Sequence, residues 1–98
     1  MYVGSLVFEP VQVTPDSITA DVTNAEASGA ITNHGTATSL LTKLDAAADA
    51  RAKGDCAKAA KHYEAFIDEL QKQSGMHVAA ATATQLVSEA QFLIANCP

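Results

Sequence analysis

The sequence predicts an all-α protein: an up-down-up three-helix bundle with a short additional N-terminal helix and an extended N-terminal segment. Apolar residues recur at helical spacing in three long segments of the chain after residue 34. The connections between these segments are very short, so consecutive helices must run antiparallel. Aromatic residues make up only 5% of the 98 residues and Ala is abundant, so the core must consist mainly of aliphatic side chains.

The first thirteen residues differ in composition from the rest of the chain. They are rich in Val, Leu and Phe and contain Gly4 and Pro10, a pattern typical of extended chain. We interpret residues 1–13 as a linker or the end of a preceding domain, and residues 14–98 as a single helical-bundle domain. The N-terminus has no basic start followed by an apolar run and a cleavage site. We therefore expect that this chain carries no signal peptide and is a piece of a larger protein.

A short helix is predicted over residues 15–27. Thr14 before Pro15 is a helix-start signal, because a hydroxyl can cap the first turn and Pro is favoured at the first helical position. Gly29 is suited to end the helix in a left-handed conformation. The apolar residues at i, i+4 and i+7 are Ile18, Val22 and Ala25. A strand is the alternative, since Ile18, Ala20 and Val22 also alternate. We expect this helix to lie across one end or one side of the bundle.

Three long amphipathic helices are predicted over residues 35–53, 55–73 and 78–96. The apolar stripe of the first consists of Ala37, Leu40, Leu41, Leu44, Ala47 and Ala48. That of the second consists of Cys56, Ala59, Ala60, Tyr63, Phe66, Ile67 and Leu70. That of the third consists of Ala79, Ala83, Leu86, Val87, Ala90, Leu93 and Ile94. No helix can bury its stripe alone, so the three stripes must face one another.

Capping residues mark the ends of these helices. Asn33 or Thr36 can cap the start of the first long helix, and Gly54 ends it. Asp55 caps the second, and Ser74-Gly75 closes it.

The two cysteines are expected to form a disulfide. Cys56 opens the second long helix and Cys97 follows the third, so an up-down-up topology places both at the same end of the bundle. An even pair of cysteines with matching topology is typical of an oxidising compartment. Two reduced thiols in the core of a cytosolic protein are the alternative.

Composition and motifs exclude several classes of function. A net charge of −5 argues against nucleic acid, and no apolar stretch is long enough for membrane insertion. We find no nucleophile–base pair, phosphate-binding loop or metal motif, so we expect no enzyme, no catalytic residue, no cofactor and no metal. His34, His62 and His77 are expected on the surface or at caps. A zinc site involving His34 and His77, which fall at one end of the bundle, is the alternative.

The third long helix offers a candidate docking face. From Val78 to Pro98 the only charged side chain is that of Glu89. The small or uncharged positions off the apolar stripe are Ala80, Ala81, Thr84, Ser88, Gln91 and Ala95. Solvated helices normally carry charges at such positions, so this face is smooth enough for another chain to approach. The alternative is an Ala-rich helix partly covered by residues 2–13.

Several of these residues occur in a pattern that resembles the FIMAH domain family. The matching features are Gly29-x-Ile31-x-Asn33-x-Gly35, Ser39-Leu40-Leu41-x-Lys43-Leu44, Gly54, Ala65-Phe66-Ile67, Gln73-Ser74-Gly75 and Ala90-x-x-Leu93-Ile94. The resemblance covers about residues 17–97. Met76 and His77 stand where the family usually has a basic residue.

The resemblance implies a non-catalytic accessory or interaction module at the C-terminus of a larger secreted bacterial protein. Its expected location is secreted or cell-surface, and its expected partners are the preceding domain and an unknown protein. The alternatives are a structural cap that stabilises the preceding domain and weak polysaccharide or cell-wall binding. The small number of aromatic residues weakens the polysaccharide alternative.

The segment from Gly54 to Tyr63 is also similar to the turn and second helix of a tetratricopeptide repeat. A 34-residue offset from Gly54 reaches Ala20 and Ser88, and neither begins a matching Gly-Asp turn. We therefore expect no repeat architecture.

Overall fold

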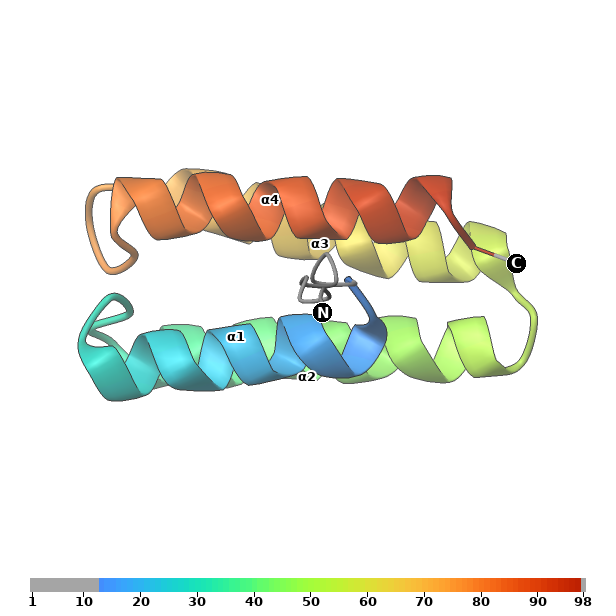
Figure 1. Ribbon diagram of the computed structural model, residues 1–98, viewed down its shortest axis with the longest axis horizontal. Coiled ribbons are helices and arrows are strands. Elements are labelled where there is room, and N and C mark those ends of the chain that lie inside the picture. Colours follow the sequence, from blue (N-terminus) through green and yellow to red (C-terminus); the bar gives the residue numbers. More distant parts are fainter. Residues whose placement is uncertain (1–12, 98) are drawn as a thin grey trace, which may run out of the picture.

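The computed structural model describes residues 13–97. These residues form four α-helices: α1 (Pro15–Ser28), α2 (His34–Ala52), α3 (Cys56–Gln73) and α4 (Ala80–Ala95). Each helix contacts the next along the chain, and α4 also contacts α1, which closes the ring. In Figure 1, α1 and α2 lie together in one layer, and α3 and α4 lie in the other. The prediction of an all-helical fold is confirmed.

The place of α1 is the main refinement of the predicted architecture. The helix runs alongside α2 and α4 for its full length, as a fourth member of the bundle (Figure 1). Ile18 and Val22 are fully buried, because they fill the space between the facing sides of α2 and α4. The alternative of a strand in this segment is wrong.

The core is a single cluster of side chains contributed by all four helices and the loops between them. It consists of Ile18, Val22, Ile31, Ala37, Leu40, Leu44, Ala47, Ala50, Ala59, Tyr63, Phe66, Leu70, Val78, Ala83, Leu86, Ala90 and Leu93. Most of these positions belong to the predicted stripes. Ala79 does not: it is exposed, because α4 begins one residue later and Ala79 is its N-cap. Val78, two residues before the helix, takes the core position instead.

Side-chain caps start three of the four helices. The Thr14 hydroxyl accepts a hydrogen bond from Ser17 N at 3.0 Å, and the Ser17 hydroxyl accepts one from Thr14 N at 2.8 Å. Asn33 Oδ1 caps α2 by accepting from Thr36 N at 2.9 Å, and Asp55 caps α3. The predicted caps are therefore confirmed at all three starts, with Asn33 rather than Thr36 capping α2. The helix α4 has no side-chain cap.

A backbone pairing between two loops replaces that missing cap. The α1–α2 and α3–α4 loops meet in an isolated antiparallel bridge between Ile31 and Val78. Thr32 N donates to His77 O at 2.8 Å, and Ala79 N donates to Ala30 O at 2.8 Å. The pairing fixes where α4 begins and satisfies backbone groups that a helix start leaves open.

The bridge also explains the spacing Gly29-x-Ile31-x-Asn33-x-Gly35. Gly29 ends α1 at φ 89°, a left-handed backbone conformation that residues other than Gly and Asn rarely adopt. Ile31 is buried and paired with Val78, and Asn33 caps α2. A Cβ atom at Gly35 would lie 3.1 Å from Asn33 Oδ1, so a larger residue here would press on the oxygen that caps α2.

Candidate interaction surface

The outer side of α4 carries the predicted docking face. Its six residues, Ala80, Ala81, Thr84, Ser88, Gln91 and Ala95, are all exposed. Phe92 lies on the same helix and is 48% exposed, which makes it one of two large apolar side chains exposed among residues 13–97. The face therefore combines small uncharged residues with one exposed aromatic ring.

A shallow groove runs along each flank of this face. The groove toward α3 has a volume of about 260 Å³ and is lined by Gln71, Ser74, Ala83, Thr84, Val87, Ser88 and Gln91. The groove on the other flank has a volume of about 450 Å³ and is lined by Val13, Thr84, Gln85, Ser88, Glu89 and Phe92. Thr84 and Ser88 separate the two grooves, so a partner seated on these residues can place side chains into both.

Glu89 is not part of the exposed face, although it is the only charged residue of α4. Its Oε2 accepts a hydrogen bond from Gln85 Nε2 at 3.1 Å. Burial, and secondly a hydrogen bond with Asp21 of α1, raises the pKa of Glu89 to about 7. The sequence shows that Glu89 is the only charged residue of this helix, but it does not indicate that Asp21 of α1 lies near it.

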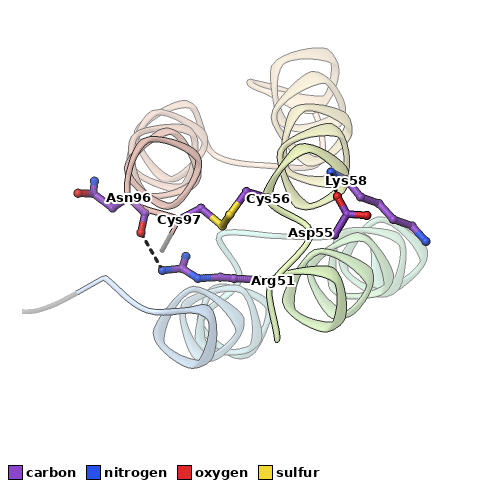
Figure 2. The surroundings of a disulfide bond; sticks show 6 residues. All are labelled: Arg51, Asp55, Cys56, Lys58, Asn96 and Cys97. Carbon is purple, nitrogen blue, oxygen red and sulfur yellow. Dashed lines mark hydrogen bonds between the residues drawn. A yellow bond between two sulfur atoms is a disulfide. The ribbon is translucent and has the colours of Figure 1, made fainter. Parts of the chain in front are cut away.

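The disulfide between Cys56 and Cys97 is present, and its Cα atoms are 5.9 Å apart. Figure 2 shows that it joins the start of α3 to the end of α4, on the side of the bundle away from the loop bridge. Arg51, near the end of α2, reaches toward the same place, and its Nη2 donates to Asn96 O at 3.1 Å (Figure 2). This end of the molecule is thus held by one covalent bond and one charged hydrogen bond.

Tyr63 lies in the core with only 1% of its surface exposed. Burial raises the pKa of its hydroxyl, and the positive charge of the nearby Arg51 acts in the opposite direction. Tyr63 Oη and Arg51 Nη1 are both buried, and neither has a hydrogen bond of good geometry within residues 13–97. The helical spacing predicted that Tyr63 faces the core, but it did not predict the approach of Arg51 from another helix.

The histidines do not form a metal centre in the part of the chain that the structure describes, where no group of three or more potential ligands comes together. His34 Nδ1 lies 2.7 Å from Glu26 Oε2, at the surface. His77 is exposed and uses its carbonyl oxygen in the loop bridge. Glu69 of α3 takes part in a separate cluster. It accepts hydrogen bonds from Lys43 at 3.0 Å and from Ser39 at 2.8 Å, and these bonds join α2 to α3.

None of the helices in the described residues is long and apolar enough to cross a membrane.

These features define a small disulfide-linked helical bundle with an uncharged, grooved face on its last helix. A model of the FIMAH domain matches residues 15–95, so the chain belongs to the FIMAH domain family. The resemblance inferred from the sequence motifs is confirmed. Searches of curated proteins and of solved structures find no significant match.

Proposed function

We propose that this domain is a non-catalytic accessory module of a larger secreted bacterial protein, and that it attaches to a protein partner through the outer face of α4. The observation that carries the proposal is the exposed, uncharged surface of Ala81, Thr84 and Ser88 between two grooves. Small side chains allow close approach of a partner backbone, and grooves on both flanks accept its side chains.

The chemistry of the face favours a protein over other partners. The chain carries a net charge of −5, so a polyanion such as nucleic acid is repelled. A polysaccharide needs exposed aromatic platforms, but Tyr63 and Phe66 are buried in the core. Phe92 is exposed and is the best candidate for an apolar anchor. The proposal requires no catalytic residue, cofactor or metal.

The proposed location is extracytoplasmic, at the cell surface or in the medium. The Cys56–Cys97 disulfide supports it, since such bonds persist in oxidising compartments. A C-terminal position in the parent protein is part of the same proposal and follows the expectation for the family.

Arginine substitutions on the face test the attachment. The secreted proteins of the source bacterium are passed over the immobilised domain, and the captured partner is identified by mass spectrometry. Ser88→Arg and Ala81→Arg should reduce its capture at least about tenfold, because a long charged side chain blocks close packing and is costly to bury.

Ala65→Arg is the matched control, since Ala65 is an exposed alanine on α3. It should leave capture unchanged, and circular dichroism should show that all three variants are folded. Equal capture by Ser88→Arg, Ala81→Arg and the unaltered domain would rule out this face.

A structural cap on the preceding domain is the second candidate. Val13, the first described residue, packs against the core and lines the groove beside Phe92 of α4. Under this alternative, a chain that starts at Thr14 is less stable than the full chain and associates through the uncovered surface. If the shortened chain melts at the same temperature and stays monomeric, residues 1–13 are a linker.

A further inference from the structure

The contact between α1 and α4 contains a buried carboxylate oxygen without a hydrogen-bond donor. Glu89 uses Oε2 to accept from Gln85 Nε2 at 3.1 Å. Its Oε1 is buried and has no hydrogen-bond partner among residues 13–97. A buried acceptor left in this condition is destabilising, and its environment should contain an explanation.

The neighbour of Glu89 is another carboxyl group. Asp21 of α1 lines the same groove as Gln85, the residue that donates to Glu89, and a hydrogen bond with Asp21 is the second cause, after burial, of the raised pKa of Glu89. The helix α4 packs against α1 and α3, and within the described residues Asp21 is the only charged group that affects the titration of Glu89. Among residues 13–97, no charged group of α3 and no cation takes part. Two ionised carboxylates are both acceptors, so they can bond only when one carries a proton.

We propose that Glu89 carries a proton that it donates to Asp21, and that this bond holds α1 against α4 until rising pH removes it. A protonated Glu89 Oε1 is a hydrogen-bond donor to Asp21 and is no longer an unpaired acceptor. Once it is lost, two negative charges face each other across the contact and push the helices apart. The bundle thereby contains a pH-sensitive contact between its first and last helices.

The direction of the pH effect follows from the raised pKa of Glu89. In the unfolded chain Glu89 titrates near its ordinary value of 4.5, and in the folded protein near about 7. The folded state therefore holds this proton more tightly. The bond contributes fully below about pH 4.5, and the contribution is lost as pH rises through about 7.

The loosening should be local. Ile18 and Val22 also hold α1 in the core, through apolar burial in which the proton takes no part. The groove between α1 and α4, of about 300 Å³, includes Asp21, Asn24 and Gln85 in its lining and is the place that opens. Glu89 also lines the groove beside the docking face, so the proton affects one edge of that face. The proposal itself requires no partner.

Two measurements on the full chain test the proposal. Carbon-13 NMR of the Glu89 carboxyl carbon gives its pKa directly. Hydrogen exchange of residues 15–28, corrected for the intrinsic rate, compares about pH 5 with about pH 8.5. We expect titration of Glu89 well above its ordinary value of 4.5 and at least about threefold faster corrected exchange at the higher pH. Titration near the ordinary value, or equal exchange at both pH values, would overturn the proposal.

Two variants distinguish this bond from a general effect of pH. Glu89→Gln keeps a donor toward Asp21 but has no proton to lose, so exchange in α1 should no longer depend on pH. Asp21→Asn replaces the facing charge by an amide, so the pKa of Glu89 should fall. Glu64→Gln, on the exposed side of α3, is the control and should behave like the unaltered protein. If Glu89→Gln does not fold, the NMR result with Asp21→Asn decides alone: an unchanged pKa of Glu89 refutes the bond.

Discussion

At the scale of single residues, the hydroxyl of Tyr63 is a polar group in the interior that the helical pattern did not explain. Tyr63 faces the core as predicted, but its hydroxyl is buried beside the Arg51 guanidinium. Arg51 lies in the last turn of α2, where its charge favours the negative end of that helix. It also crosses to α4 and donates to Asn96 O. Arg51 of α2 thus lies between Tyr63 of α3 and the end of α4.

Replacing Tyr63 by Phe tests the energetic role of this hydroxyl. The ring contributes most of the buried area, and the hydroxyl has no hydrogen bond of good geometry within residues 13–97. Tyr63→Phe should therefore change the free energy of unfolding by no more than about 1 kcal/mol. Phe66→Ala, the comparison, should lose about 3–5 kcal/mol, because it leaves a cavity in the same helix interface. Urea denaturation measures both.

The Tyr63→Phe variant also tests how the stability of the protein depends on pH. Burial raises the pKa of Tyr63 above its ordinary value of 10.0, so the folded state keeps the proton longer than the unfolded chain. Stability should then fall as pH rises above about 10. Lysines titrate in the same range, so the test is the difference between the two proteins. Tyr63→Phe should lose less stability than the unaltered protein between about pH 9 and 11, and equal losses would contradict the raised pKa.

At the scale of helices and loops, side-chain caps position the starts of three helices, and one long-range backbone pairing positions the start of the fourth. Thr14, Asn33 and Asp55 start their helices through their own side chains. The helix α4 starts without such a cap, because the Ile31–Val78 bridge positions its first residue. The Gly29 turn brings Ile31 to that bridge, so one glycine is coupled to the beginning of the last helix.

Substitutions at Gly29 test this coupling. Its φ of 89° is accessible to Asn but strained for a β-branched residue. Gly29→Val should lower the free energy of unfolding by about 1–3 kcal/mol, and Gly29→Asn by clearly less. Hydrogen exchange at Ala79 N, which donates to Ala30 O, should accelerate in the Val variant. If Val and Asn are equally tolerated, the left-handed conformation is not required.

The disulfide is the other device at this scale. It closes a loop with a sequence separation of 41 residues, for which loop-closure entropy predicts about 4 kcal/mol of stabilisation. Cys56→Ser should lower the melting temperature by about 15–30 °C. The double variant with Cys97→Ser should match the reduced protein, which controls for an unpaired thiol. Intact mass and thiol titration establish the bond itself, and two reactive thiols in protein from an oxidising medium would refute it.

At the scale of the whole molecule, α1 closes the ring of helices. It covers the apolar sides of α2 and α4, which would otherwise face solvent. A helix that only lay across one end would contribute little to stability. As a member of the bundle, α1 should unfold together with the other helices in one transition.

Alanine substitution in α1 tests its membership. Ile18 and Leu44 are both almost fully buried, one in α1 and one in α2. Ile18→Ala and Leu44→Ala should therefore each cost about 2–5 kcal/mol and leave a single cooperative transition. Thr23→Ala, at an exposed position of α1, controls for the helix itself and should change stability little. A small effect of Ile18→Ala would show that α1 is an appendage.

The sequence by itself determined the four helices, three of their caps, most of the core and the pairing of Cys56 with Cys97. These features depend on local hydrogen bonds and on helical periodicity, and short connections leave antiparallel packing as the only arrangement. The candidate docking face could also be predicted, because its residues lie opposite the apolar stripe of one helix.

Only the tertiary structure decided how the helices are rotated and which side chains meet across them. Asp21 and Glu89 are far apart in sequence, as are Arg51 and Tyr63 from Asn96, and periodicity does not fix such pairs. The apolar pattern of residues 18–22 does not indicate which helices α1 packs against. Its position depends on the apolar surfaces of α2 and α4, where Ile18 and Val22 are buried. Burial between helices, rather than any local signal, gave Glu89 its raised pKa.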